Sequence, residues 1–277
     1  MLLAGLLFAC MGGLVKAGAG HFSSIEMVFY RSLIGLLVLA GVTGSRGLRM
    51  TTPHWRVHVS RSVSGFAALV LYFYCMTHLP LATAVTLNYT SPLFLAVLSA
   101  IVLKETPSAR LISALLLGFA GALLLLKPTL AASQLLAGLL GLISGLLAGV
   151  AYLNVKQLGA LGEPDWRTVL YFTLFSTLAS GAWLAVRGFS PVTWDNGWIL
   201  IGLGLTATLA QLAMTRAYRT GKTLVVGALA YSTIAFSSFV GALAFHERLA
   251  WSSWLAIGLI VAGGLVATRA AAKPVGA

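Results

Sequence analysis

The stretch 81-LATAVTLNYTSPLFLAVLSAIVLKE-105 occurs a second time, in altered form, 142 positions further along the chain. This offset places identical or similar residues on one another: Tyr89 on Tyr231, Thr90 on Ser232, Ser91 on Thr233, Phe94 on Phe236 and Glu105 on Glu247. Each copy is a long apolar run with polar residues in its middle and a charged residue at its end, which is typical of a membrane-spanning helix with one wet face. A self-similar membrane protein with polar residues at mid-depth in both copies is expected to be a transporter built from repeats.

The amino-acid composition excludes a soluble protein. Hydrophobic residues make up 59% of the chain and charged residues 9%, so too few polar residues exist to cover a water-facing surface. The net charge of +12 comes from basic residues spread between the apolar runs, which indicates membrane topology and not nucleic-acid binding. Cys10 and Cys75 both lie in apolar runs, so we predict no disulfide framework, and we expect neither a metal nor a cofactor. The opening apolar run lacks a preceding basic segment and is interpreted as a retained first helix.

Apolar runs of about 20 residues, each long enough for one membrane crossing, predict ten helices. Their expected ranges are Leu2–Ala17, Ser24–Val42, Val59–Thr77, Leu81–Leu103, Ala109–Leu126, Gln134–Lys156, Arg167–Val186, Gly197–Tyr218, Thr223–Phe245 and Trp251–Thr268. If both termini are cytoplasmic, thirteen basic residues, Arg61 among them, fall in the inner joints and tail, against four in the outer joints. This bias supports the even number of crossings and the orientation.

The predicted organisation is one membrane domain made of two five-helix repeats, residues 1–127 and 134–277. Because five is odd, the second repeat enters the membrane from the opposite side, so the repeats are inverted relative to each other. The expected fold is therefore an all-α membrane protein with ten transmembrane helices in two inverted repeats around a central cavity. Glycines Gly138, Gly141, Gly145 and Gly149 recur at helical spacing, and we interpret that face as one of close helix packing.

The chain resembles the drug/metabolite transporter superfamily in its EamA-type, ten-helix form. The resemblance covers nearly the whole chain and depends on the two repeats, on Phe29-Tyr30-Arg31, on the turn from His78 to Ala84, and on Lys104-Glu105 and His246-Glu247. Within the superfamily the aromatic-lined helices are most similar to the YddG-type bacterial exporters of aromatic amino acids. The resemblance implies inward-facing helices around a central cavity, and export as the direction of transport. Pro92 is matched by Ile234 and Asn88 by Ala230, so any ligand site is expected to be asymmetric.

Polar and aromatic residues inside the apolar runs are the candidate site. The residues predicted to contact the substrate are Tyr74, His78, Asn88, Tyr89, Ser91, Pro92, Tyr152, Gln211, Tyr231 and Thr233. Pro92 leaves a backbone carbonyl without a hydrogen-bond donor, which then needs protein, water or substrate beside it. The alternative is that Asn88 and Ser91 only hold helices together and that Gln211 cross-links its neighbours. His78 and the tyrosines near it are alternatively residues of the membrane interface.

Arg31 and Glu26 are assigned a structural or coupling role. A charge in the middle of helix two costs about 2.5 kcal/mol or more, so Arg31 needs a partner. That partner is either a substrate carboxylate or the backbone of another helix, because Glu26 lies five positions away and is poorly placed for a helical pair. Acidic residues are otherwise absent from the apolar runs and no ATP-binding loop occurs, which favours gradient-driven transport over ion coupling.

The function predicted from sequence is export of small organic solutes, most specifically aromatic amino acids or related metabolites, by alternating access in a bacterial inner membrane. The expected partners are a small-molecule substrate and membrane lipid, with no nucleic acid, and the protein is expected to be a monomer or weak homodimer. One alternative is a proton-coupled exporter of another metabolite or a drug, with Glu26 or His78 carrying the proton. A membrane-embedded enzyme is disfavoured because the chain lacks HExxH, GxSxG and a paired acidic or histidine cluster, and a scaffold subunit would need no polar residues at mid-helix.

Overall fold

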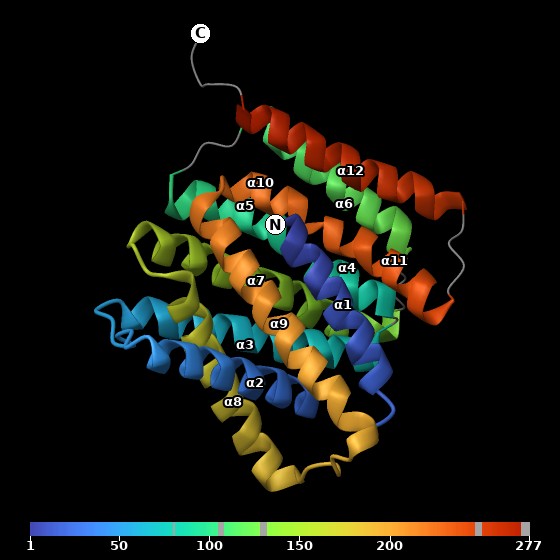
Figure 1. Cartoon of the computed structure of the whole chain (residues 1–277). Coiled ribbons are helices and arrows are strands. Elements are labelled where there is room, and N and C mark those ends of the chain that lie inside the picture. Colours follow the sequence, from blue (N-terminus) through green and yellow to red (C-terminus); the bar gives the residue numbers. More distant parts are fainter. Residues whose placement is uncertain (80, 105–107, 128–131, 247–250, 273–277) are drawn as a thin grey trace.

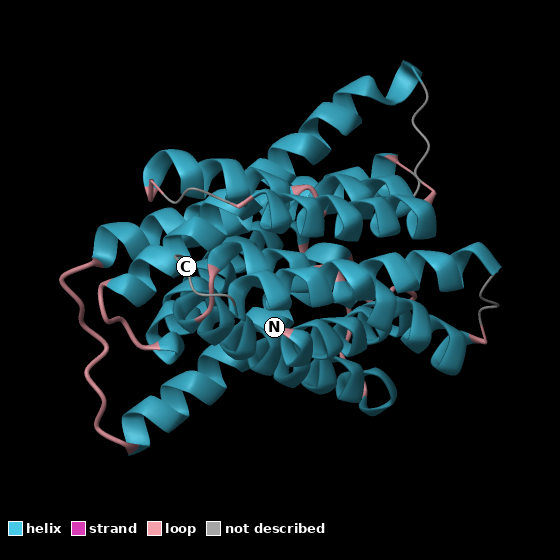
Figure 2. Ribbon diagram, turned by 90° about the horizontal axis from the view of Figure 1, so that it is seen from above, coloured by secondary structure: helices cyan, strands magenta, loops and turns pink. Residues whose placement is uncertain are grey.

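The computed structural model describes residues 1–79, 81–104, 108–127, 132–246 and 251–272. These ranges are helical and contain no strand (Figure 2). The α-helices are α1 Leu2–Gly18, α2 Ser24–Ser45, α3 Trp55–His78, α4 Leu81–Asn88, α5 Ser91–Val102, α6 Ala109–Leu126, α7 Leu135–Ala160, α8 Asp165–Arg187, α9 Trp194–Thr220, α10 Thr223–Ala230, α11 Ser232–Phe245 and α12 Trp251–Ala272, and a 3-10 turn spans Ala132–Gln134 (Figure 1). Pro80, Glu105 and Glu247, which the sequence analysis used, lie outside the described residues.

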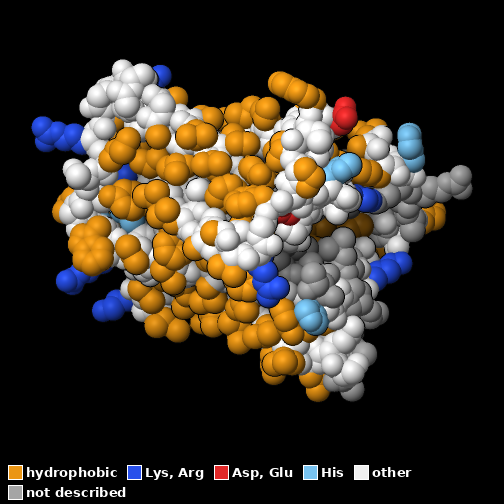
Figure 3. Space-filling model, turned by 90° about the horizontal axis from the view of Figure 1, so that it is seen from below, with side chains coloured by type: hydrophobic (Ala, Val, Ile, Leu, Met, Phe, Trp, Pro, Cys, Tyr) orange, Lys and Arg blue, Asp and Glu red, His pale blue; other side chains and the backbone are white. Residues whose placement is uncertain are grey.

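Within the described residues, the structure contains ten helical segments that correspond to the ten predicted helices. Eight spans are long and apolar enough to cross a membrane when α4–α5 and α10–α11 each count as one, and α1 with 17 residues and the more polar α3 complete the set. In the view of Figure 3, apolar side chains cover much of the surface, while most of the visible charged side chains lie towards its two ends. That distribution fits a protein whose middle is surrounded by lipid.

The two halves of the chain match helix by helix. The offset of 142 positions seen in the sequence carries the bounds of α4 onto those of α10, and the end of α3 onto the end of α9. The helix contacts show the same correspondence. Helices α3 and α5 pack against α7, and their counterparts α9 and α11 pack against α1. In addition, α2 packs against α8, and α6 packs against α12. The two halves are therefore related by an approximate two-fold exchange, and their opposed orientation in the membrane stays a prediction.

Both copies of the quoted stretch are interrupted at the same point. In the first, Thr90 Oγ1 donates to the carbonyl of Leu87 at 2.5 Å, and in the second, Ser232 Oγ donates to the carbonyl of Leu229 at 2.6 Å. A hydroxyl that bonds a carbonyl three residues back competes with the helical ladder and bends the helix. Pro92 occupies the first turn of α5, but the second copy is interrupted without a proline. The hydroxyl contact is therefore common to both breaks, whereas the proline occurs only at the first.

Small residues allow the first helix of each half to approach the interrupted helix of the other half. Gly145 of α7 lies so close to the Leu87 carbonyl that a Cβ there would be 2.8 Å from this oxygen. Gly5 of α1 lies equally close to the second break, where a Cβ would be 2.9 Å from Ser232 Oγ. The interpretation of the glycine face of α7 as a packing surface is confirmed.

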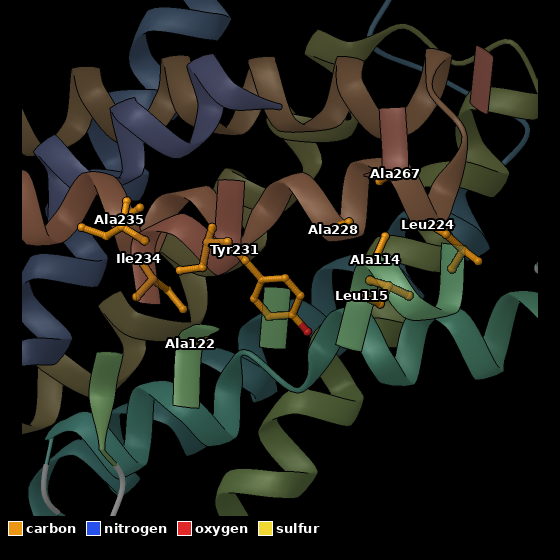
Figure 4. Packing of buried hydrophobic residues seen from close by; sticks show 11 residues of the cluster. Ala114, Leu115, Ala122, Leu224, Ala228, Tyr231, Ile234, Ala235 and Ala267 are labelled. Atoms are coloured by element: carbon orange, nitrogen blue, oxygen red, sulfur yellow. The ribbon is translucent and has the colours of Figure 1, made fainter. Parts of the chain in front are cut away.

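An apolar core lies between the interrupted helices and the α6–α12 pair, which lies along one side of the bundle (Figure 1). Fully buried Tyr231 is its largest member and lies among apolar side chains (Figure 4). Its ring packs on Gly118 of α6.

Candidate functional site

The centre of the bundle contains an arginine on α3 that meets α8 and α9. Arg61 is 2% exposed; its Nη2 donates to Gln211 Oε1 at 3.2 Å, and its guanidinium lies 3.7 Å above the ring centroid of Phe172. Arg31 of α2 borders a cavity of about 10 Å³ together with the same Phe172 and Gln211. The predicted Gln211 therefore lies at the meeting point of two cationic side chains from the first half of the chain.

Within the described residues, the cavity found between α2, α8 and α9 is much smaller than the central cavity that the sequence predicted. A space of about 10 Å³ holds roughly one water molecule. The side chains of Arg31, Arg61, Phe172 and Gln211 occupy the position where the hollow was expected. The residues around it are nonetheless polar, which is unusual for the centre of a membrane protein.

Sequence reasoning missed Arg61 because it counted this residue among the cytoplasmic joints. Helix three was expected to begin at Val59, but α3 begins at Trp55, which carries Arg61 six residues, or about 9 Å, into the helix. The signal that could have revealed it is the spacing of His58, Arg61 and Gly65, which places a polar stripe on one helix face. All four polar side chains His58, Arg61, Ser62 and Ser64 are buried.

Tyrosines from both halves surround this centre. Tyr152 of α7 stacks on Tyr218 of α9, with ring centroids 5.0 Å apart and planes 15° apart. Tyr89 and Tyr231 form a second pair from the two halves, with ring centroids 6.4 Å apart. A side-chain hydrogen bond joins Tyr89 to Thr233. The hydroxyls of Tyr218 and Tyr231 are buried without a hydrogen-bond partner. Tyr218 is a second residue that the sequence analysis did not select.

Other predicted residues do not join this centre. Tyr74 and His78 are exposed at the last turn of α3, where their rings stack at 3.9 Å. Asn88 Nδ2 donates to Ser144 Oγ at 3.0 Å, and Ser144 donates to the carbonyl of Ala68, so this chain of hydrogen bonds connects α4, α7 and α3. The arrangement favours the interpretation of Asn88 as a link between helices, and its contact with substrate stays a prediction.

Ser91 and Pro92 are buried where the interrupted helix meets its neighbours. The carbonyl of Ser91 lies against Gly149 of α7, and Pro92 lies against Gly227 of α10. Both contacts are helix packing across the two halves. A role for these residues in binding stays a prediction.

A buried carboxylate connects the two halves at the end of the bundle where α1 joins α2, hereafter the α1–α2 end. Glu26 accepts hydrogen bonds from the amide and hydroxyl of Ser23, at 2.7 and 2.6 Å, and from the amide and hydroxyl of Ser190 in the α8–α9 joint. Glu26 forms no ion pair with Arg31 in the described part of the chain; Arg31 Nη1 instead donates to Met11 Sδ at 3.7 Å. We call Glu26, Ser23 and Ser190 the Glu26 cluster.

A second carboxylate connects the halves at the opposite end, hereafter the α2–α3 end. Glu163 of the α7–α8 joint accepts hydrogen bonds from Thr52 Oγ1 and, at 2.7 Å, from Arg167 Nη1, and lies 3.5 Å from His58 Nε2. Arg167 also donates to the carbonyl of Arg49 at 2.7 Å. Burial alone would raise the pKa of Glu163, but the hydrogen bonds from Thr52 and Arg167 and the charges of Arg167 and His58 outweigh it and hold the pKa below its ordinary value. We call Glu163, Thr52, Arg167 and His58 the Glu163 cluster.

The two clusters occupy equivalent places in the repeated fold. In each cluster, a carboxylate at the loop between the first two helices of one half accepts a hydrogen bond from the loop between the second and third helices of the other half. Glu26 accepts from Ser190, and Glu163 accepts from Thr52. Both ends of the bundle are thus closed by contacts between the halves. A separate cavity of about 430 Å³ opens at the α2–α3 end, where Asp165 pairs with Arg219 at 3.0 Å and Arg216 lies beside them.

Comparison with known proteins supports a transport function. The profile of the EamA-like transporter family matches residues 1–127 and 135–269. The chain is 29% identical over 266 residues to a pseudopaline exporter of Pseudomonas aeruginosa, covering 95% of this chain and 90% of that protein. It is 25% identical to a riboflavin transporter of Brucella anthropi over 89% of this chain and 88% of the relative. A solved crystal structure superimposes with a TM-score of 0.85 over 98% of both chains at 21% identity, which shows the shared fold. These relatives are not described as aromatic amino-acid exporters, so the resemblance to YddG-type proteins stays a prediction.

Proposed function

Because the chain belongs to the EamA-like transporter family and is a multi-pass membrane transporter of small metabolites, we propose that it exports amino acids or related metabolites by alternating access. In this proposal the two halves rearrange around the polar centre, so that the α1–α2 end and the α2–α3 end open in turn. Twelve inner against four outer basic residues, after Arg61 is moved to the centre, support cytoplasmic termini.

The observation that carries the proposal is the closure of both ends by equivalent contacts between the halves. The Glu26 cluster closes the α1–α2 end and the Glu163 cluster closes the α2–α3 end, while the polar centre between them is nearly filled. A transporter that alternates between two openings passes through such an occluded state. Opening one end breaks one carboxylate cluster and leaves the other intact, so the two conformations differ by a small number of hydrogen bonds.

The positions of the acidic residues support gradient-driven transport. Glu26 and Glu163 are used in the two end clusters, Asp165 pairs with Arg219, and Asp195 is exposed in the first turn of α9. Within the described residues, no carboxylate lies beside Arg61 or Gln211, where a transported proton would be exchanged with substrate. Proton coupling through Glu26 is the alternative, because protonation of this carboxylate would weaken the Glu26 cluster.

The test is counterflow in proteoliposomes combined with cross-linking of each end. The purified protein, with Cys10 and Cys75 replaced by serine, receives a cysteine pair at Thr52 and Glu163 or at Ser23 and Ser190. We expect oxidation of either pair to stop the uptake of labelled amino acids and a reductant to restore it. Full flux with one end cross-linked would contradict alternating access. An imposed proton gradient that drives accumulation would replace the gradient-driven mechanism with proton coupling.

A further inference from the structure

Arg61 has hydrogen-bonding capacity that the protein does not use. A guanidinium carries five N–H donors in a planar fork. Within the described residues, Arg61 donates one hydrogen bond, from Nη2 to Gln211. Its Nε and Nη1 are buried without a partner. No carboxylate of the described residues forms an ion pair with it. A buried cation with unused hydrogen-bond donors at the centre of a membrane protein is expected to bind an anion.

A second cation faces the same place. Arg31 lines the small central cavity with Phe172 and Gln211, the two residues that Arg61 also contacts. Helix α2 brings Arg31 in about 10 Å from the α1–α2 end, while α3 brings Arg61 in about 9 Å from the α2–α3 end. Glu26 cannot serve as their counter-ion because Ser23 and Ser190 occupy its oxygens. Two positive charges therefore converge on Gln211 from opposite sides.

The fold itself does not require these charges. The position equivalent to Arg61 in the second half is Leu203, which is fully buried in an apolar cluster, and Arg31 is matched by Thr173. An arginine without an anionic partner is costly in the membrane interior, and the stacking of Arg61 on Phe172 offsets only part of that cost. Gly65 also leaves room for the guanidinium, since a Cβ there would lie 3.2 Å from Nη1. The leucine in the second half shows that an apolar side chain satisfies the same packing position.

We propose that Arg61, assisted by Arg31, binds a carboxylate group of the transported solute, an inference that rests on the proposed function and names its substrate class. A carboxylate forms two parallel hydrogen bonds with one edge of a guanidinium, either Nε with Nη2 or Nη1 with Nη2. Nε and Nη1 of Arg61 are free, and Nη2 becomes available when its hydrogen bond to Gln211 breaks. The stacked rings of Tyr152 and Tyr218 border this region and present an apolar face for the rest of the solute. The substrates are therefore organic acids or zwitterions, and a solute without a carboxylate is rejected because the arginines then remain unpaired.

The occluded centre sets the order of events. A cavity of about 10 Å³ cannot hold a solute, so binding occurs after one end opens and the halves separate around Gln211. Arg61 is carried by α3 and Gln211 by α9, so movement of one half against the other breaks the hydrogen bond between them. Gln211 then occupies the carboxylate's place in the substrate-free protein.

The experiment is counterflow into proteoliposomes with probes that differ in the carboxylate. Labelled L-phenylalanine, N-acetyl-L-phenylalanine and succinate carry it; L-phenylalaninamide, adenosine and spermidine do not. We expect the protein to transport only carboxylates, and R61Q to lower their kcat/KM at least tenfold while R61K retains part of the activity. The matched control is R56Q, since Arg56 is exposed one and a half turns earlier on α3. Thermal unfolding in detergent checks that each variant is folded, and G65A, which crowds the guanidinium, provides a second test if R61Q does not fold.

The outcomes separate this inference from the proposed function. Transport of phenylalaninamide, adenosine or spermidine by the unmodified protein, or unchanged carboxylate flux in R61Q, would overturn the inference and leave the transporter assignment in place. Chloride counterflow that depends on Arg61 would show that the cations serve an inorganic anion and would also overturn it. Failure of every probe to exchange would overturn the proposed function itself.

Discussion

Replacing Glu163 by glutamine is expected to shift the α2–α3 end of the bundle towards an open state. The carboxylate is buried, accepts hydrogen bonds from Thr52 and Arg167, and lies beside His58. A hydrogen bond to a charged group contributes about 1.5–3 kcal/mol, and glutamine loses the charge while keeping the shape. The loss of one such interaction corresponds to a change of about 10- to 150-fold in the equilibrium between closed and open ends.

The assay is the distance between spin labels on the two joints that Glu163 connects. Met50 in the α2–α3 joint and Leu161 in the α7–α8 joint are exposed, so cysteines at these positions, in a background without Cys10 and Cys75, accept labels without disturbing the core. We expect one short distance in the parent protein and an added longer population in E163Q. D195N is the matched control, because Asp195 is an exposed carboxylate at the start of α9.

The same contacts predict how this end responds to pH. The pKa of Glu163 in the closed state lies below its ordinary value of 4.5, so the contribution of the cluster is fully present above about pH 4.5 and is lost as the pH falls through the lowered pKa. The parent protein should therefore show the longer distance only under acidic conditions, whereas E163Q should show it throughout. Identical distance distributions for both proteins at neutral pH would refute the reasoning.

Three further results are expected. E26Q should lengthen the distance between spin labels at His21 and Val192 at the α1–α2 end, because the hydrogen bonds to Ser190 weaken. The distance between labels at Met50 and Leu161 should stay unchanged. Movement at both ends would contradict independent clusters. Y231F should leave thermal stability equal or higher, because the hydroxyl is buried without a partner. Y231A should lower the free energy of unfolding by about 3–5 kcal/mol. A loss of stability in Y231F as large as in Y231A would show that the hydroxyl has a partner. G145A should lower the free energy of unfolding by about 1–3 kcal/mol, because the added methyl crowds the Leu87 carbonyl. G12A should leave it unchanged, because its added methyl meets nothing within 4 Å. Equal unfolding midpoints for the two variants would exclude the close approach of α7 to the Leu87 carbonyl.

The number of helices and their membrane-spanning character could be predicted from sequence because both follow from the lipid that surrounds the chain. A run of about 20 apolar residues must form a helix in lipid, where each backbone group needs an internal partner. The internal repeat could also be recognised from sequence, because the offset of 142 positions aligns Thr90 with Ser232. Both hydroxyls make the same local contact in the structure, with a carbonyl three residues earlier. Helix ends were less accurate, and the error of four residues at the start of α3 concealed Arg61.

The composition of the centre depended on contacts that no local pattern encodes. Gln211 and Tyr152 were selected as polar residues on apolar helices, and the structure brings both near Arg61, whereas Asn88, with the same sequence signature, bonds to Ser144 instead. Which face of a helix points inward is set by its rotation against neighbours, through close approaches such as Gly145 on the broken helix. The sequence by itself determined ten helices in a doubled membrane protein, because hydropathy and backbone bonding are local. Only the tertiary structure decided that Arg61 reaches Gln211 and that Glu26 and Glu163 close the ends, because the contacts of these residues with Gln211, Ser190 and Thr52 join positions more than a hundred apart in the chain.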